Sequence, residues 1–184
     1  MSHETVLRRD DAVLVLIDVQ EKLLPAIANR DEVVRNCRIL LEGARILGIP
    51  IIVTEQYTKG LGPTVADLVA AAGDAPRFEK MTFSCAGCDL FAEKLEDIDR
   101  EQVLLCGIEA HVCVVQTALD LLADGWQIQV PADAVGSRRA ENRQIAIDRM
   151  RQSGVVITAT ESALFEMLVA AGTDAFKSIV RLVR

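Results

Sequence analysis

Short apolar runs alternate with amphipathic segments along nearly all of the 184 residues of this chain. The first run, AVLVLI at residues 12–17, is apolar at every position, which is typical of a parallel strand buried on both faces. At residues 102–122 a similar run is broken by Gly107 and followed, after a polar turn, by apolar residues at helical spacing. Strands that alternate with helices in this way predict a parallel sheet with right-handed crossovers.

We therefore predict an α/β fold, a doubly wound three-layer sandwich with a six-stranded, mainly parallel sheet, in one domain over residues 1–184. The strands are expected at residues 12–17, 49–54, 77–83, 103–106, 126–130 and 154–158. The helices are expected at about residues 31–47, 64–72, 87–98, 111–122, 140–153, 161–170 and 175–183. The expected strand order is 3-2-1-4-5-6, which makes strands 1 and 4 neighbours where the order reverses.

Composition excludes several classes of function. A net charge of −7 argues against a nucleic-acid partner, because phosphates would be repelled. The N-terminal sequence MSHETVLRRDD has no apolar core of a secretory signal, and no apolar run is long enough to span a bilayer. Five cysteines, an odd number, fit a reducing cytoplasm better than a disulfide framework. We expect a cytoplasmic protein with no membrane partner.

Two reactive residue types follow the strands that meet at the reversal point. Asp18 comes directly after strand 1, and Cys113 lies in the first turn of the helix after strand 4. Ligands bind in this crevice in open parallel sheets. The start of a helix favours negative charge and so predicts a lowered pKa for the Cys113 thiol, for which Asp18 is a proton acceptor. The alternatives are a helix cap for Asp18 and a small buried core residue for Cys113.

Other candidate groups are weaker. His111 lies two residues before Cys113, so the two side chains do not share a helix face, and a polar residue at a helix start is the better interpretation. Lys80 either points into the crevice, where it would stabilise a thiolate, or is solvated. Cys85 and Cys88 form a single CxxC, which could be a redox dithiol or half a zinc site, but no second pair exists. No glycine-rich nucleotide motif is present, and we expect no cofactor.

Three motifs in a fixed order carry a family resemblance: LIDVQ at residues 16–20, Lys80, and CGIEAHVC at residues 106–113. Over about residues 12–168 the chain resembles the isochorismatase-like cysteine hydrolases. The sequences TEQY at 54–57, GLGPT at 60–64 and RMRQSG at 149–154 are most similar to the isochorismatase domain-containing branch. The resemblance implies a doubly wound six-stranded sheet, often assembled as dimers or larger rings.

The same resemblance implies roles for individual residues. Asp18 would be the base, Lys80 the activating cation and Cys113 the nucleophile. A cis peptide between Ile108 and Glu109 would direct the backbone N–H groups of Glu109 and Cys113 at a developing oxyanion. Within the matching motifs, the residues expected to bind the substrate are Gln20, Gln56 and Tyr57.

Two departures refine the function. Nicotinamidases of this family hold a metal through histidines after strand 2, whereas EQYTKGLGP at residues 55–63 contains none, so no metal is expected. True isochorismatases often lack the cysteine, so Cys113 points away from vinyl-ether hydrolysis. We predict a metal-independent, homo-oligomeric hydrolase that cleaves a small amide or related C–N bond through a Cys113 thioester. The alternatives are a catalytically quiet binding or scaffold protein, a vinyl-ether hydrolase, and a thiol redox sensor that uses Cys85 and Cys88.

Overall fold

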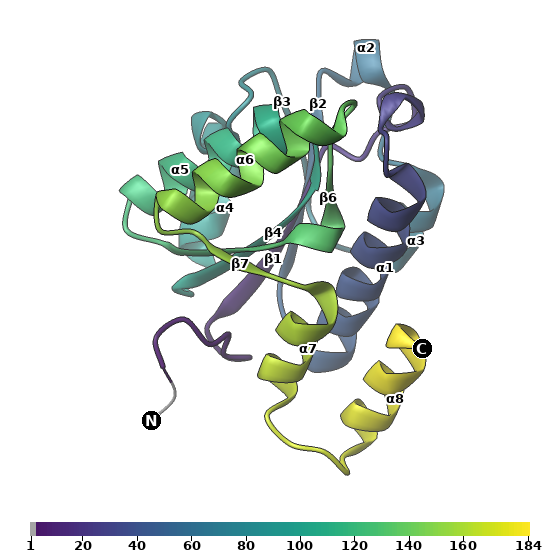
Figure 1. Cartoon of the computed structure of the whole chain (residues 1–184), viewed down its shortest axis with the longest axis vertical. Helices are drawn as coiled ribbons and strands as arrows, with labels where there is room; N and C mark the ends of the chain where they lie inside the picture. The colour runs from purple at the N-terminus through teal and green to yellow at the C-terminus, as the bar shows by residue number, and fades with distance from the viewer. Residues whose placement is uncertain (1–2) are drawn as a thin grey trace.

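The computed structural model describes residues 3–184, which form a central parallel sheet with helices on both faces (Figure 1). The sheet has the order β3-β2-β1-β4-β5-β7, and a short seventh strand, β6, pairs with β4. Every pair is parallel. The strands are β1 Ala12–Ile17, β2 Ile51–Gln56, β3 Arg77–Lys80, β4 Gln102–Ile108, β5 Gln127–Pro131, β6 Val135–Gly136 and β7 Val156–Thr158. The predicted class and strand order are confirmed, with the predicted sixth strand corresponding to β7.

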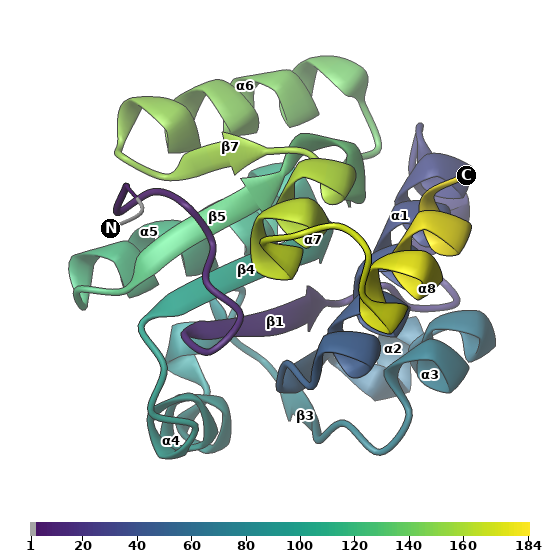
Figure 2. The same cartoon turned by 90° about the horizontal axis from the view of Figure 1, so that it is seen from below.

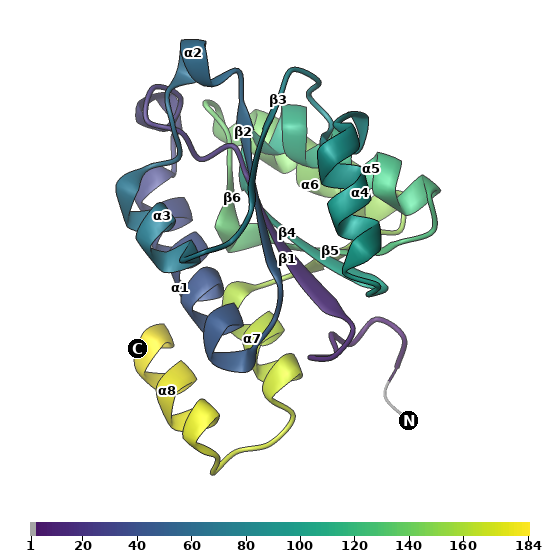
Figure 3. The same ribbon diagram turned by 180° about the vertical axis from the view of Figure 1, so that it is seen from behind.

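The helices divide into two layers. The bounds are α1 Arg30–Leu47, α2 Thr58–Leu61, α3 Ala66–Ala72, α4 Asp89–Asp97, α5 Val115–Ala123, α6 Ala140–Gln152, α7 Thr160–Leu168 and α8 Asp174–Val183. Helices α1, α3, α7 and α8 cover one face of the sheet, and α4, α5 and α6 cover the other, as the views from below and behind show (Figures 2 and 3). Across residues 3–184, no helix combines the length and apolar character needed to cross a membrane.

Strand β1 lies at the centre of the sheet and contributes to both cores. Its alternate residues Leu14 and Leu16 pack with the α1 layer, whereas Val13, Val15 and Ile17 pack with the α4–α5 layer. This alternation follows from the pleat, which directs successive side chains to opposite faces. It explains why the run from Ala12 to Ile17 is apolar throughout.

The ends of several elements differ from the sequence prediction. Strand β2 begins at Ile51 rather than residue 49, because Pro50 has no N–H to donate; its carbonyl accepts from Leu14. Strand β3 ends at Lys80 rather than residue 83, since the chain beyond it turns back toward the Lys80 side chain. Helix α1 begins at Arg30, with Asp31 inside its first turn.

Strand β6 was not predicted, because two residues are too few to show a period. Strand β5 pairs with only the first half of β4, residues 102–104. Beyond the point where β5 diverges, Val135 and Gly136 pair with Gly107 and Ile108 and extend the ladder to the carboxyl end of β4. A Cβ at position 136 would lie 2.7 Å from Ile27 Cγ2, so a residue larger than glycine would require neighbouring side chains to move.

Gly107 determines how closely β1 and β4 approach at their carboxyl ends. It pairs with Ile17, the last residue of β1, and adopts a φ of +120°. A Cβ at this position would lie 2.1 Å from the carbonyl oxygen of Ile17, well inside any permitted contact. The close approach brings Asp18, the residue directly after β1, beside the segment that carries Cys113.

Replacing Gly107 with alanine is expected to destabilise the protein by about 3–5 kcal/mol, since backbone strain and overpacking combine at one position. Urea unfolding measures the change. Gly125→Ala is a matched control: Gly125 also has a positive φ, of +97°, but an added Cβ would meet no atom within 4 Å. It should cost only about 1–2 kcal/mol. Equal losses in the two variants would show that the close approach to Ile17 is unimportant.

Candidate functional site

Asp18 and Lys80 form a buried ion pair at the carboxyl edge of the sheet. Asp18 directly follows β1 with a φ of 54°, a left-handed conformation that aspartate tolerates better than most residues. Lys80 is the last residue of β3 and lies across β2 from it. The Nζ atom of Lys80 lies 2.7 Å from Oδ2 of Asp18, and both side chains are fully shielded from solvent. A pair this deeply buried keeps its charges only where hydrogen bonds replace water.

The Lys80 ammonium donates those hydrogen bonds to neighbouring oxygens. Its Nζ donates to Gln56 Oε1 at 2.8 Å and to the backbone carbonyls of Phe83 and Thr82 at 3.1 and 3.3 Å. Burial lowers the pKa of Lys80, whereas the nearby Asp18, Cys85 and Cys113 raise it. The charges outweigh burial, so the pKa lies above its ordinary value. Lys80 is therefore a fixed positive charge at neutral pH.

The Asp18 carboxylate is held at both oxygens. Oδ2 accepts from Lys80, and Oδ1 accepts from the hydroxyl of Thr54 in β2 at 2.8 Å. The Thr54 carbonyl also accepts from the Asp18 amide at 3.1 Å. Thr54 is the first residue of the TEQY segment, but its sequence context predicts no role for it, because a threonine within a β-strand has no signature of its own.

Cys113 lies in a π-helical turn, Ala110–Val114, that leads into α5. The turn places it at the start of the helical segment, as expected, with 6% of its surface exposed. The direction of its pKa shift is opposite to the expected one. Burial raises the pKa of the Cys113 thiol, the Asp18 carboxylate raises it further, and the opposing charge of Lys80 does not compensate. Desolvation and a neighbouring anion outweigh the helix end, so the thiol is protonated at neutral pH.

Two backbone amides, those of Glu109 and Cys113, belong to the turn that carries the thiol. The peptide between Ile108 and Glu109 is cis. In the turn that follows, the amides of Val112 and Val114 both donate to the Glu109 carbonyl, at 3.0 and 3.2 Å. Within residues 3–184, neither the Glu109 amide nor the Cys113 amide donates to a group outside this turn. These are the two N–H groups that the family resemblance assigns to an oxyanion.

The residues expected to bind substrate are placed differently from one another. Gln20 is fully buried: its Nε2 donates to the carbonyls of Gln56 and Gly62, and its Oε1 accepts from the Gln56 amide. These bonds connect the Gln20 side chain to the backbone at the end of β2 and in the loop that follows it. The Gln56 side chain holds Lys80 and the Met81 carbonyl. Tyr57 is 44% exposed and is the one of the three whose side chain reaches solvent freely.

Cys85 and Cys88 differ in burial and in the groups that their thiols contact. The Cys85 thiol is fully buried and lies 3.7 Å from Thr54 Oγ1, whereas the Cys88 thiol is partly exposed and lies 3.8 Å from the Glu79 carbonyl. All five cysteines are free.

His111, which the sequence predicts to be a polar residue at a helix start, contacts Ser137 Oγ at 3.0 Å. In the described part of the chain, no three His, Cys, Asp or Glu side chains are grouped closely enough to hold a metal ion.

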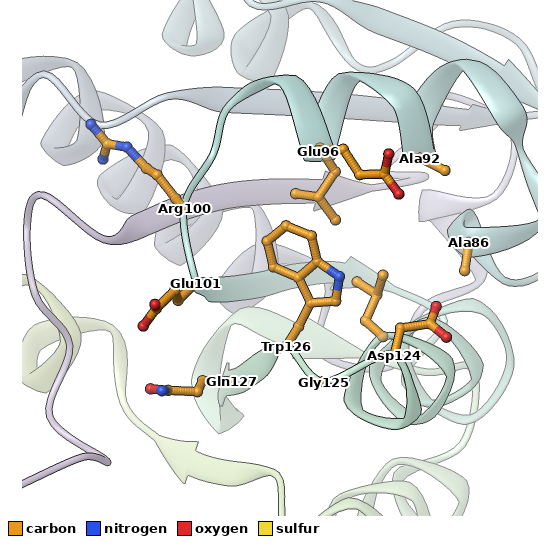
Figure 4. Close-up of a pocket in the computed structure, with 11 residues that line it drawn as sticks. Ala86, Ala92, Glu96, Arg100, Glu101, Asp124, Gly125, Trp126 and Gln127 are labelled. Carbon is orange, nitrogen blue, oxygen red and sulfur yellow. The ribbon is translucent and has the colours of Figure 1, made fainter.

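A separate pocket of about 620 Å³ lies at the opposite edge of the sheet (Figure 4). Trp126, which directly precedes β5, stands at its centre, with Glu96 from α4 and Asp124 from the end of α5 on either side. None of the residues of the Asp18–Lys80–Cys113 cluster lines it. Since ligands of open parallel sheets bind beyond the carboxyl ends of the strands, the buried cluster is the candidate active site.

The family model for the isochorismatase domain matches residues 12–162. The chain belongs to the isochorismatase family. The match begins at the first residue of β1 and ends within α7, so it includes Asp18, Lys80 and Cys113. The family assignment made from three short motifs is therefore confirmed, and the fold is that of isochorismatase-family hydrolases.

Individual relatives agree with this assignment. Isochorismatase domain-containing protein 2 of Danio rerio is 44% identical over 171 residues, covering 93% of this chain and 86% of that protein. The structure of MAR1 ribonuclease from Caenorhabditis elegans is 38% identical with a TM-score of 0.91, covering 96% of this chain and 91% of that one. The YcaC gene product of Escherichia coli, described as an octameric hydrolase of unknown specificity, has a TM-score of 0.92 at 24% identity, covering 99% and 92%. The first two support the isochorismatase domain-containing branch, and the third shows the shared fold.

Asp18→Asn is expected to accelerate alkylation of Cys113 by iodoacetamide at pH 7 by about tenfold or more. The substitution removes the anion that raises the thiol pKa and leaves the Lys80 cation that lowers it. In the parent, the labelling rate should rise about tenfold per pH unit above pH 7, because the thiolate fraction does. Peptide mass mapping follows Cys113, with Cys88 as an internal control for reagent activity. A slower reaction in Asp18→Asn would contradict the assigned cause of the shift.

Proposed function

We propose that this protein is a metal-independent hydrolase in which Cys113 attacks the carbonyl carbon of a small amide or a related C–N bond. The observation that carries the proposal is the placement of a protonated, slightly exposed thiol next to a buried Asp18–Lys80 ion pair. A thiol nucleophile needs a base within reach and a site that accepts negative charge on the carbonyl oxygen. Membership of a hydrolase family supports the reaction class.

In the proposed first half-reaction, Asp18 takes the proton of the Cys113 thiol as sulfur bonds to the carbonyl carbon. The amides of Glu109 and Cys113 donate to the developing oxyanion. When the tetrahedral adduct collapses, the C–N bond breaks, the amine leaves with the proton from Asp18, and a thioester remains on Cys113. In the second half, Asp18 takes a proton from water as the water oxygen bonds to the thioester carbon. The C–S bond then breaks, Asp18 returns the proton to the Cys113 sulfur, and the acid is released.

The ion pair explains why this proton transfer has a low energetic cost in a buried site. Before transfer the cluster contains one anion, Asp18, and one cation, Lys80. During transfer the negative charge moves from Asp18 through the Cys113 sulfur to the substrate oxygen, while the cation stays the same, so the total charge of the site is unchanged. Lys80 needs no movement because four oxygens already hold it. A preorganised charge of this kind lowers a barrier more than one that must reorganise.

Exposure limits which of the two buried thiols can be the nucleophile. Cys85 also lies beside the ion pair, but its side chain has no exposed surface, whereas 6% of the Cys113 surface is exposed. The small exposed fraction of Cys113 favours a small substrate. Although one relative is described as a ribonuclease, a net charge of −7 on this chain disfavours a polyanionic substrate.

A turned-over amide or ester is expected to leave a transient mass adduct on the Cys113 peptide, because catalysis through a thioester runs in two halves. A panel of small amides, followed by release of ammonia or amine, identifies the substrate, and rapid quenching with mass spectrometry detects the adduct. Added hydroxylamine should capture it as a hydroxamate.

Cys113→Ala should lose turnover by a factor of at least about 10³, and Cys88→Ala should keep it within a few-fold. If Cys113→Ala kept the activity of the parent, water would be the nucleophile and the reaction would belong with vinyl-ether hydrolysis. If no small amide or ester were cleaved and Cys113 stayed unmodified, the fold would instead serve in binding.

We further propose that the protein works in the reducing cytoplasm as a dimer or larger assembly. Five free thiols support the compartment. Three large apolar side chains in the loops after β2 and β3 support the assembly: Tyr57, Met81 and Phe83, which are 44%, 68% and 55% exposed. Light scattering of the purified protein is expected to give at least twice the chain mass. Phe83→Glu should reduce that mass, and Ile145→Glu, at another exposed apolar position on α6, should not. A monomer at micromolar concentration would contradict the assembly.

A further inference from the structure

We propose that Thr54 is a positioning residue for the reaction proposed above and that the Cys85 thiol orients it. The proposed relay runs from the Cys85 S–H to the Thr54 hydroxyl and from that hydroxyl to Asp18 Oδ1. The contacts that support it are 3.7 Å from Cys85 Sγ to Thr54 Oγ1 and 2.8 Å from Thr54 Oγ1 to Asp18 Oδ1. None of the three residues has exposed surface, so water does not compete for these bonds.

Thr54 binds Asp18 at two points. Its carbonyl accepts from the Asp18 amide, and its hydroxyl donates to the Asp18 carboxylate. The sheet register pairs Thr54 with Ile17, so the strand itself sets the hydroxyl next to the base. With Lys80 at the other oxygen, the plane of the carboxylate is fixed. Without the Thr54 hydroxyl, Oδ1 would lose its donor, and the hydrogen bond from Lys80 to Oδ2 would have to orient the carboxylate.

Cys85 explains why the Thr54 hydroxyl points toward Asp18. A hydroxyl has one proton, and it donates to one acceptor while its lone pairs accept from another donor. Burial and the Asp18 charge raise the pKa of the Cys85 thiol to about 11, so at neutral pH it is an S–H donor. An S–H directed at the Thr54 oxygen leaves the hydroxyl proton for Asp18. This gives the buried half of the CxxC a role that neither a redox dithiol nor a zinc site provides.

The relay is tied to the helix that carries the nucleophile. The Cys85 amide donates to Thr117 Oγ1 at 2.9 Å. Thr117 is in α5, four residues after Cys113, and therefore lies one turn further along the same helical face. The base and the nucleophile are positioned by one connected set of buried groups that runs through Thr117, Cys85 and Thr54.

The proposal predicts a change in the proton equilibrium between Asp18 and Cys113. The Thr54 donor stabilises the ionised carboxylate, so Thr54→Val should shift the shared proton from Cys113 toward Asp18 and increase the thiolate population. Iodoacetamide is the probe, because it reports the thiolate without requiring a known substrate. Alkylation of Cys113 at pH 7 should be about tenfold faster in Thr54→Val and within twofold of the parent in Thr54→Ser, which keeps the donor. Cys85→Ala should give a smaller increase, of a few-fold, and Cys85→Ser should restore the parent rate.

A double-mutant cycle separates this role from a general loosening of the structure. In the Asp18→Asn variant the carboxylate is absent, so adding Thr54→Val should change the labelling rate by less than twofold. Cys37 and Cys106, which are buried in the opposite core, should stay unlabelled throughout and report an intact fold. An unchanged rate in Thr54→Val, or an equal increase in the Asp18→Asn variant, would overturn the relay. These outcomes are independent of the adduct experiment, which tests the nucleophile itself.

Discussion

The buried ion pair between Asp18 and Lys80 is the interaction on which the rest of the site depends. Its two partners come from β1 and β3, and the strand between them, β2, supplies Thr54 and Gln56 to hold both charges. Removing two charges from water costs several kcal/mol per ion, which only close pairing and full hydrogen bonding offset. The strand order 3-2-1 therefore places the groups in sequence across the sheet. The cation Lys80 ends β3, the supporting residues lie on β2, and the anion Asp18 follows β1. A sheet wound in another order would leave one of the charges without its partners.

Much of the fold follows from periodicity that is visible in the sequence. The uniformly apolar run from Ala12 to Ile17 identifies the central strand because both of its faces are buried. Gly107 and the polar turn after it mark the strand-to-helix junction that carries Cys113. The crossover rules for parallel sheets then place Asp18 beside that junction. Strand β6 could not be predicted in this way, because two residues are too few to show a period.

The chemistry of the site was harder to predict than its location. The helix start at Cys113 argued for a lowered thiol pKa, but burial and the Asp18 carboxylate act more strongly in the opposite direction. Neither effect can be evaluated before the distance between the two side chains is known. The spacing of Cys85 and Cys88 indicates only a CxxC, whereas Cys85 contacts Thr54 and Thr117, which are 31 and 32 residues away in the sequence. The bonds of Gln20 to backbone 36 and 42 residues away could not be predicted from the sequence for the same reason.

The protonated state of Cys113 has a consequence for how the protein survives in a cell. Peroxides and other oxidants react with thiolates, and a cysteine held permanently as the anion is converted to sulfenic and then to irreversible sulfinic acid. Here the sulfur would become nucleophilic only while a substrate carbonyl occupies the space beside Asp18. Between turnovers the carboxylate that we propose as the base keeps the sulfur in its least oxidisable form. In the proposed mechanism a single charged group accounts for both reactivity and chemical durability.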